Sequence, residues 1–374
     1  MARILILGGG FAGVVAAESL VKQFGGDHQI TLVSRRDRFL FYPALVRLAF
    51  GKCEPEDVTF DLRTSMLDRR ITFIEGEVAR IDPENREVII AHGEVSGRLS
   101  YDYLIYALGR RLATEEVSGF FEHAHHLLDL DGALKFGEAV RKFESGRVII
   151  GQCSEARLPV PVYEAAFSLS NLLDENGARE KSIISIVSPG TPGSEFDDPT
   201  VARMLSEALQ RRRIDYLPNL EIKRATQSSV ITKDGFELKY YLLMLLPPFH
   251  GSSAAARLGI TSEDGYINVD WNMKVLGAER MYAAGDCVNF SGPKLGHLAV
   301  HQAEVAAANL AAEIAGHEPV VHYDHNLVTI IDIDGESIYL HKDLWTNEPS
   351  SVRHGRFWNW AKLIHQKYWE ATHA

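Results

Sequence analysis

A glycine-rich loop close to the start of the chain leaves few folds open to it. The loop Gly8-Gly9-Gly10-Phe11-Ala12-Gly13 follows residues 3–7, which predict a buried strand. Val14–Phe24 comes next and predicts a helix, and Gln29–Val33 predicts a second strand. The chain therefore opens with a βαβ unit, and the expected fold class is α/β.

The spacing of three glycines in this loop predicts a dinucleotide site. Gly8 permits a tight turn, Gly10 lets the backbone approach a pyrophosphate, and Gly13 lets the helix pack closely on the sheet. The amino-terminal end of the helix then faces the anionic phosphates.

The acidic residue usual at the end of the second strand is absent. Ser34 stands there, followed by Arg35. We expect Ser34 to hydrogen-bond a ribose hydroxyl and Arg35 to contact phosphate. The alternative is that the arginines at this turn are solvated surface charge.

Length and charge exclude several classes of protein. The chain has 374 residues, of which 46% are hydrophobic and 24% charged, enough for two or three domains. Its net charge of −11 argues against a nucleic-acid partner. The three cysteines have no regular spacing, which favours a reducing compartment and predicts no metal site.

No targeting or spanning segment is evident. The apolar start runs directly into the glycine loop, and no stretch of about 18 apolar residues occurs. We expect a cytoplasmic protein that is soluble or peripheral on the membrane.

The α/β pattern restarts in the middle of the chain. Strands are predicted at Gly146–Gly151 and Ser182–Ser188, and helices at Val162–Leu173 and Thr200–Arg213. This predicts a second Rossmann-like domain inserted into the first, with a small C-terminal region ending in an amphipathic helix. The expected ranges are 1–111 and 246–317 for the first domain, 112–245 for the second, and 318–374 for the C-terminal region.

A second cofactor signal lies far along the chain, at Met281–Cys287. There Gly285 and Asp286 form a turn before a helix predicted at about His297–Ala315, and the Asp286 carboxylate suits hydroxyl groups of FAD. Lys294, between Pro293 and Gly296, is a candidate for stabilising negative charge on a reduced flavin, together with the positive end of that helix. The alternative for Lys294 is an exposed loop lysine.

These motifs give the chain a resemblance to the flavoproteins with two dinucleotide-binding domains. Within them it resembles the sulfide:quinone oxidoreductases and the type II NADH dehydrogenases. The matching segments are Gly8–Gly13, Phe41–Leu45, Glu75–Val78, Tyr101–Gly109, Leu246–Pro248, Ala284–Asp286 and Pro293–Val300. The resemblance implies FAD as cofactor, and adds Ala12, Pro43, Val78, Ala107, Gly109, Gly285 and Leu295 to the expected FAD-binding residues.

The resemblance to sulfide:quinone oxidoreductases implies sulfide as donor, a redox cysteine pair, and membrane quinone as acceptor. Leu158 occupies the place of one cysteine, and Thr329 lies where the other is expected. A redox role for Cys153 requires that it meet Cys287 within disulfide range. The alternative is that both thiols are small buried hydrophobic groups.

The resemblance to NADH dehydrogenases implies NADH as donor and a second phosphate-binding loop. The segment Gly151–Pro159 holds one glycine and ends in a proline, which makes such a loop less favoured. A third alternative is a flavin-bearing subunit that passes electrons to a partner or only binds it.

One carboxylate and one pair of histidines are further candidate site residues. By the resemblance, Glu164 matches a carboxylate near the flavin in both branches, and burial would suit it to deliver protons to quinone. The alternative is a glutamate at the N-terminal end of a helix, favoured there by the helix dipole. His297 and His301 share a helix face, but too few further ligands accompany them for a metal site.

The C-terminal tail is aromatic and basic in an otherwise acidic chain. Helical spacing relates Phe357, Trp360, Ala361, Ile364 and Tyr368, and the cations are Arg353, Arg356, Lys362 and Lys367. Such a helix suits the membrane surface. The alternative is a helix that packs on the body or on a second subunit, which leaves a homo-oligomer open.

Overall fold

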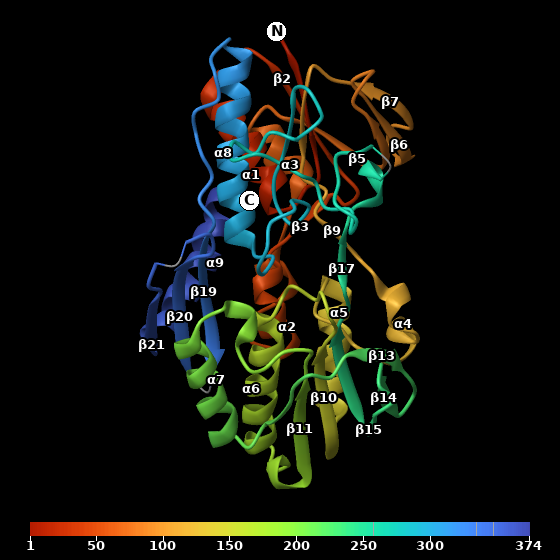
Figure 1. Ribbon diagram of the computed structural model, residues 1–374, viewed down its shortest axis with the longest axis vertical. Coiled ribbons are helices and arrows are strands. Elements are labelled where there is room, and N and C mark those ends of the chain that lie inside the picture. Colours follow the sequence, from red (N-terminus) through yellow and green to blue (C-terminus); the bar gives the residue numbers. More distant parts are fainter. Residues whose placement is uncertain (257, 334, 347) are drawn as a thin grey trace.

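The computed structural model describes residues 1–256, 258–333, 335–346 and 348–374. Two α/β parts lie one above the other, and a smaller C-terminal unit lies along their side (Figure 1). The first sheet has the strand order β18-β8-β1-β2-β5-β6-β7. Its strands are β1 (Arg3–Leu7), β2 (Gln29–Ser34), β5 (Thr72–Asp82), β6 (Glu87–Gly93), β7 (Gly97–Ser100), β8 (Tyr103–Tyr106) and β18 (Met281–Ala283).

The first sheet is parallel from β18 to β5, with β6 and β7 added antiparallel at one edge. Helices α1 (Phe11–Phe24) and α8 (Gly296–Ile314) pack against each other on this sheet. The inner strands are apolar and almost fully buried, as expected of a parallel sheet covered on both faces. Also in this part are α2 (Leu45–Ala49), α3 (Leu62–Asp68) and the short pair β3 (Arg38–Leu40) and β4 (Thr59–Asp61).

The second sheet lies wholly between β8 and β18 in the chain, as the insertion predicts. Its order is β12-β11-β10-β16, and all four strands are parallel. The strands are β10 (Gly146–Gln152), β11 (Ser182–Val187), β12 (Asp215–Leu217) and β16 (Leu242–Leu246), and the helices α4 (Phe120–His123), α5 (Leu130–Lys142), α6 (Val160–Glu175) and α7 (Pro199–Arg211). A small antiparallel sheet of β13 (Ile222–Ala225), β14 (Ser229–Thr232) and β15 (Glu237–Lys239) flanks it.

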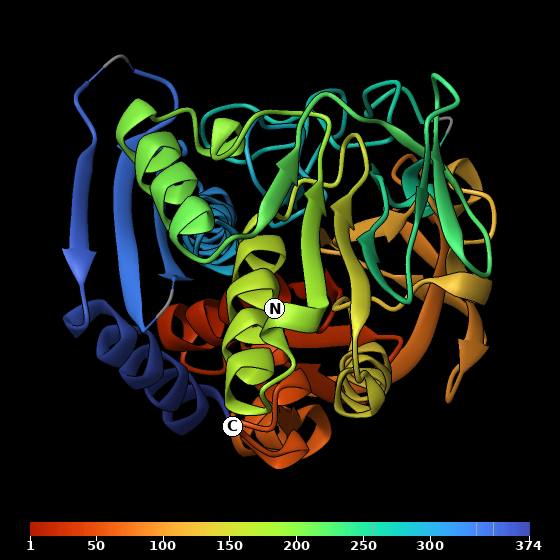
Figure 2. The ribbon, with the colours of Figure 1, turned by 90° about the horizontal axis from the view of Figure 1, so that it is seen from below.

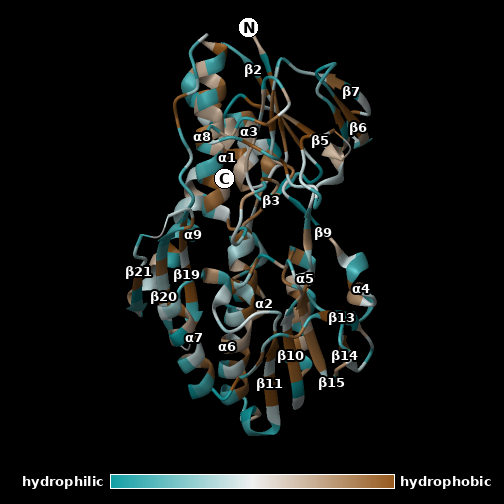
Figure 3. Ribbon diagram, viewed as in Figure 1, coloured by the Kyte–Doolittle hydropathy of each residue, from teal (hydrophilic) through white to brown (hydrophobic). Residues whose placement is uncertain are grey.

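Two antiparallel strands connect the two α/β parts. The chain leaves the first sheet through β9 (Arg110–Leu112) and returns through β17 (Phe249–Gly251), and these strands pair with each other. Figure 3 shows the central strands of both sheets largely in the hydrophobic colour, whereas the outer face of α7 is hydrophilic. One large hydrophobic core cluster includes residues of both sheets, and a smaller cluster includes residues of β10 and β14.

The C-terminal unit is an antiparallel sheet followed by a helix. Strands β19 (Asn326–Ile333), β20 (Glu336–Asp343) and β21 (Ser351–Gly355) precede α9 (Phe357–His373). Seen from below, α9 lies along the boundary between these strands and the N-terminal part of the chain (Figure 2). Within the described ranges, no helix combines the length and apolarity that crossing a bilayer requires.

Most predicted elements are present, with shifted ends. The first helix begins at Phe11 rather than Val14, because the glycine loop enters the helix directly after Gly10. The strand predicted at Gly146–Gly151 extends to Gln152, and the helix predicted at Thr200–Arg213 spans Pro199–Arg211. The domain ranges remain a prediction.

Candidate active site

The glycine loop joins β1 to α1 at the carboxyl edge of the first sheet. Gly8 has a φ of +111°, and a Cβ there would lie 2.1 Å from the backbone oxygen of Ala107, the residue after β8. A Cβ at Gly13 would lie 1.7 Å from the Gly8 oxygen. Only glycine therefore fits at these two positions, for the reasons that the sequence predicts.

Gly10 differs from the other two glycines, because a Cβ there would meet nothing within 4 Å. It is the N-cap of α1, and no side chain caps that helix. The first N–H groups of α1 thus face open space at the positive end of the helix, which is the donor arrangement that a pyrophosphate requires.

The second motif lies directly beside this helix end. Gly285 has a φ of +90°, and a Cβ at this position would lie 3.0 Å from the Ala12 Cβ. The Gly285 N–H donates to Gln302 Oε1 at 2.7 Å, which ties the turn to α8. α8 begins at Gly296 next to the Phe11 ring, and it also lacks a side-chain cap. The two motifs therefore meet, with two uncapped helix ends adjacent to each other.

Asp286 has a partner that the sequence does not reveal. Its carboxylate accepts a hydrogen bond from Arg110 at the start of β9, and both side chains are largely buried. The Arg110 guanidinium lies over the Phe249 ring at 4.1 Å and over the Tyr42 ring at 5.7 Å. Sequence reasoning missed Arg110, because its position beside Asp286 depends on the pairing of β9 with β17.

Lys294 is buried, which excludes the interpretation as an exposed loop lysine. Its ammonium donates to the backbone oxygens of Val288 and Phe290 and lies 4.7 Å from the centre of the Tyr266 ring. Burial, assisted by the nearby Arg157, lowers the pKa of Lys294 well below its usual range. Because the charged form is disfavoured by burial, a negative charge on a bound group nearby would stabilise the Lys294 ammonium.

The other expected cofactor residues are placed unequally. Ser34 is buried, but its hydroxyl donates to the Arg36 oxygen within its own turn, and Arg35 is exposed. Val78 is half-buried on β5. Ala107 and Gly109 lie at the end of β8, beside the glycine loop and the Arg110 turn respectively. Pro43 and Leu295 line the cavity described next.

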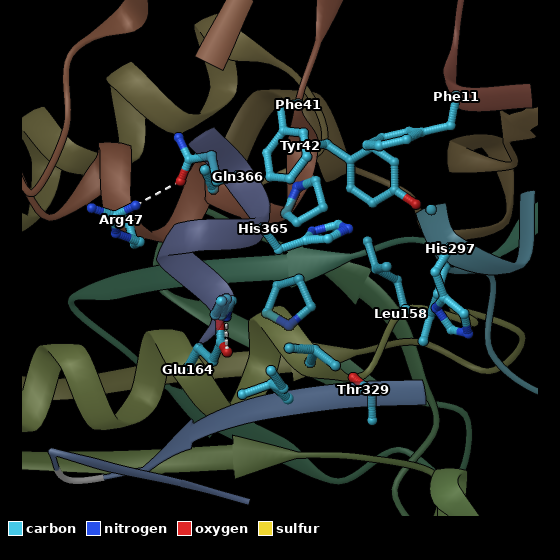
Figure 4. Close-up of a pocket in the computed structure, with 18 of the residues that line it drawn as sticks. Phe11, Phe41, Tyr42, Arg47, Leu158, Glu164, His297, Thr329, His365 and Gln366 are labelled. Carbon is cyan, nitrogen blue, oxygen red and sulfur yellow. Dashed lines mark hydrogen bonds and ion pairs between the residues drawn. The ribbon is translucent and has the colours of Figure 1, made fainter. Parts of the chain in front are cut away.

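A cavity of about 270 Å³ opens beside these motifs. Its walls come from all three parts of the chain: the 41–47 segment, the start of α6, the start of α8, β19 and α9 (Figure 4). In this view Phe11, Phe41 and Tyr42 gather on one side, and Glu164 and Thr329 lie on the other. The apolar members are Phe11, Phe41, Pro43, Ala44, Leu158, Val160, Pro161, Leu295, Val328 and Ile330.

A buried group of charges borders the cavity. The Glu164 carboxylate on α6 is paired with Lys362 of α9, and Lys362 also contacts Asp332 Oδ2 at 3.3 Å. The Asp332 N–H donates to Glu164 at 3.0 Å. Burial, only partly offset by Lys362, raises the pKa of Glu164 to about 7. A carboxyl group with this pKa gains and loses protons at neutral pH.

Two histidines also line the cavity, and both are neutral at physiological pH. Burial lowers the pKa of His297 to about 4 and lowers the pKa of His365 as well. His297 Nε2 lies against the backbone of β19, 2.9 Å from the Val328 nitrogen. His297 therefore packs the edge strand, and no group of three metal-ligating side chains occurs among the described residues.

The positions that the resemblance assigns to a cysteine pair, Leu158 and Thr329, both line the cavity. No cysteine is among the described residues that line the cavity. Cys153 and Cys287 are free thiols that pack in different hydrophobic clusters, and burial raises the pKa of each to about 12. The geometry thus gives no support to the predicted catalytic role of Cys153.

The end of β10, where a second dinucleotide loop would lie, is filled by side chains. Gln152 is buried and donates to Ser188 Oγ at 3.0 Å and to Glu195. Tyr163 donates to the same carboxylate at 3.2 Å. These groups bond to one another, and only Gln152 Oε1 among their atoms named here is buried without a partner in the described part of the chain. The filled site agrees with the sequence argument against a phosphate-binding turn after this strand.

Helix α9 supplies cavity residues that the sequence did not identify. Lys362, His365 and Gln366 line the cavity, and Gln366 accepts from Arg47 at 2.6 Å. Trp369 packs against Phe11 with ring centres 4.7 Å apart. One face of the tail therefore packs on the body, which is the alternative that the sequence left open.

The observed groups fit FAD. Open space at Gly10, an uncapped α1, and Asp286 and Lys294 beside an uncapped α8 provide donors for phosphates, a carboxylate for hydroxyls and positive charge for a flavin ring.

Comparisons with known proteins identify relatives of the chain. The model of the pyridine nucleotide-disulphide oxidoreductase family matches residues 2–152 and 170–303. A sulfide-quinone reductase of Aquifex aeolicus is 27% identical over 69% of this chain, and the match spans 61% of that protein's length. A probable NADH dehydrogenase of Dictyostelium discoideum is 25% identical over 77% of this chain and 68% of its own.

The fold also matches a solved structure. The sulfide:quinone oxidoreductase of Aquifex aeolicus superposes with a TM-score of 0.92 at 22% identity, covering 99% of this chain and 90% of that one. This likeness confirms the predicted α/β fold class. Because the family model matches most of the chain, the chain belongs to the pyridine nucleotide-disulphide oxidoreductase family, whose members are FAD-binding flavoproteins.

Proposed function

We propose that the chain is an FAD-dependent oxidoreductase that passes two electrons from a small reduced donor to a membrane quinone. The observation that carries this proposal is the apolar cavity beside the two cofactor motifs, with a buried carboxyl group of pKa about 7 on its wall. The bound FAD supplies the two-electron chemistry. Relatives named for quinone reduction support the same reaction class.

The cavity suits a flat, apolar acceptor. Phe41, Tyr42 and Pro43 form one wall, and Leu158 and Pro161 form another. Ligand sites of this kind are mostly apolar with a few polar groups that fix orientation. Here the polar groups include Glu164 and Thr329.

Reduction of a quinone to a quinol consumes two electrons and two protons. Glu164 is placed to deliver a proton to the quinone oxygen, because it borders the cavity and is protonated in part at neutral pH. Lys362 pairs with the carboxylate that remains after the first transfer, and a proton taken up from solvent restores the acid for delivery of the second proton.

The residues at the cavity and at the end of β10 constrain the electron donor. Sulfide oxidation through a protein disulfide is not supported, since Leu158 and Thr329 border the cavity and the free thiols lie elsewhere. NADH as donor is not supported either, because side chains fill the end of β10, where a second phosphate-binding loop would lie. A sulfide donor would thus have to react without a protein thiol, and NADH without a second glycine loop.

Membrane attachment is proposed through the outer face of α9. Phe357, Trp360, Ile364 and Tyr368 are 71%, 68%, 64% and 64% exposed, and their spacing places them on one face. Exposed aromatic groups on a basic helix suit the headgroup region of a bilayer. Because the inner face of α9 borders the cavity, this attachment would give quinone a short path from the bilayer, and the protein would be cytoplasmic and peripheral.

Anaerobic titration of the flavin-loaded protein tests the proposal. The visible flavin band should bleach with sulfide or with NADH, and addition of a soluble quinone should restore it. If dithionite bleaches the band and quinone fails to restore it, the quinone reaction is wrong. If neither sulfide nor NADH bleaches the band, but quinone restores it after bleaching by dithionite, the chain is an electron-transfer subunit rather than the proposed enzyme.

A further inference from the structure

We infer that Arg110 is a further FAD-binding residue, whose Nε–H donates to an oxygen atom in the ribityl or pyrophosphate part of the cofactor. The inference rests on the proposed FAD site and adds to it a residue that the glycine loop and the Asp286 turn do not indicate. The observations that support it are the buried Arg110 Nε–H, which has no hydrogen-bond acceptor among the described residues, and the excess of donors around it.

The paired strands β9 and β17 fix the position of Arg110. Its backbone on β9 pairs with Gly251 on β17, and the neighbouring Leu112 pairs with Phe249. A Cβ at Gly251 would lie 1.8 Å from the Gly265 oxygen, so the backbone is closely packed at this point. The side chain of Arg110 therefore leaves a rigid pair of strands and extends toward the flavin turn.

Most of the Arg110 guanidinium has partners. One terminal nitrogen donates to Asp286, and the faces of the group lie over Phe249 and Tyr42. Its Nε–H has no hydrogen-bond partner among the described residues, although the atom is buried. The side chain is only 12% exposed, so bulk water does not readily replace the missing acceptor.

A buried N–H without an acceptor is costly, and such groups in proteins nearly always have one. The nearby side chains leave this N–H unpaired, although the guanidinium also interacts with the Tyr42 hydroxyl. Asp286 already accepts from a terminal nitrogen, while Lys294 and Arg157, which both lie against the Tyr266 ring, are donors. An excess of donors and positive charge at this point calls for a ligand rich in acceptor oxygens.

FAD provides such oxygens. Asp286 is the residue expected to accept from its ribityl hydroxyl groups, and Arg110 is in direct contact with that carboxylate. A hydroxyl that donates to Asp286 still has lone pairs free to accept from a neighbouring N–H. Arginine is suited to this role, because its planar group donates in two directions while its charge stays fixed.

FAD affinity of the apoprotein provides the test. Arg110→Gln should weaken FAD binding, followed by flavin fluorescence, about 10- to 100-fold, equivalent to about 1.4–2.8 kcal/mol. Arg110→Lys should recover only part of the loss, since lysine lacks the Nε–H of arginine. Arg111→Gln is the matched control, because Arg111 is the next residue and forms an exposed pair with Glu115; it should bind FAD like the wild type.

A second comparison separates direct binding from an effect through Asp286. In an Asp286→Asn background, Arg110→Gln should still weaken FAD binding further. If it does not, Arg110 only orients Asp286 and direct binding is wrong; unchanged affinity in the single variant is equally contradictory. Urea unfolding of each apoprotein shows whether a loss of FAD affinity comes from misfolding. If Arg110→Gln misfolds, the FAD affinities of Arg110→Lys and of the double variant decide whether Arg110 binds FAD directly. Failure of the wild type to bind FAD would instead overturn the proposed function.

Discussion

Glu164 of α6 and Lys362 of α9 form a buried ion pair between residues that lie 198 positions apart in the chain. Their side chains are 4% and 18% exposed. The pair joins the second α/β part to the C-terminal helix at the wall of the cavity, where Asp332 of β19 also contacts Lys362. Helix α9 therefore supplies the cation that opposes the effect of burial on the group that we propose as proton donor.

Replacing Lys362 by Met should raise the pKa of Glu164 above its present value of about 7, because the cation that opposes the effect of burial is lost. The decline of quinone reduction with rising pH should move to higher pH. At pH 8 the variant should also lose about 3 kcal/mol or more of stability in urea, since Glu164 must then either stay ionised without a partner or take up a proton far above its ordinary pKa. At pH 5.5 the loss should be smaller, because Glu164 takes up a proton.

Lys342→Met is the matched control for this experiment. Lys342 pairs with Asp197, whose side chain is 86% exposed, so its removal leaves that carboxylate in water. The control should change neither the pH profile nor the difference in stability between pH 5.5 and pH 8. Equal losses at both pH values in Lys362→Met would contradict the assigned role.

Replacing Glu164 by Gln should slow quinone reduction by about 10²- to 10⁴-fold, the usual contribution of a positioned proton donor. The wild-type rate should fall as pH rises through about 7, as the carboxyl group loses its proton. The rate of the variant should be nearly independent of pH between 6 and 8. Stopped-flow reoxidation of the reduced flavin by quinone measures both rates, and an unchanged rate in the variant would assign proton delivery to another group.

The same group predicts a pH dependence of stability. Burial raises the pKa of folded Glu164 from about 4.5 to about 7. Between these values the folded state binds more protons than the unfolded state, so this contribution to stability falls as pH rises. Glu164→Gln should remove this slope from urea unfolding curves.

The sequence predicted the cofactor half of the site because its signals are local. Gly8, Gly10 and Gly13 have roles that follow from spacing, and Asp286 follows a recognisable turn. Arg110 was missed because only the pairing of β9 with β17 brings it to Asp286. No local pattern distinguishes it from Arg111, which is exposed.

For the C-terminal helix, the sequence predicted the exposed face but not the buried polar residues. Its periodicity predicted a helix and its aromatic face, and Phe357–His373 is that helix. Lys362 and Gln366 read as ordinary surface residues, because their partners Glu164 and Arg47 are distant in sequence. Burial of a polar side chain depends on such a partner, which periodicity cannot supply.

The glycine loop predicts opposite outcomes for two similar substitutions. Gly10→Ala should leave the stability of the apoprotein nearly unchanged, since the new methyl group meets nothing within 4 Å, but should weaken FAD binding at least tenfold. Gly8→Ala should destabilise the apoprotein by about 2 kcal/mol or more, because its φ is +111° and the methyl group would overlap the Ala107 oxygen. Urea unfolding and flavin fluorescence separate the two effects; equal stability losses would contradict this assignment.

Cys153→Ala should leave flavin reduction by the true donor within about twofold of the wild-type rate. The thiol is buried in the cluster around β10 and β14, its pKa is raised to about 12, and it does not line the cavity. A thiol in such a setting is a poor nucleophile. A loss of activity with unchanged folding would restore Cys153 as a redox group, and Cys287→Ala should be assayed beside it.

The outer face of α9 should control binding to lipid. Trp360→Ser and Ile364→Ser together should weaken binding to vesicles containing anionic lipid at least tenfold, about 1.4 kcal/mol, because both side chains are exposed and neither lines the cavity. Trp271→Ser, which removes an exposed tryptophan outside α9, is the control and should bind like the wild type. Reduction of a soluble short-chain quinone should survive both changes, since Glu164 and Lys362 are untouched, whereas reduction of a quinone dissolved in the vesicles should fall with binding. Vesicle flotation that is equal for all three proteins would assign this face to a second copy of the chain, which sedimentation would then detect.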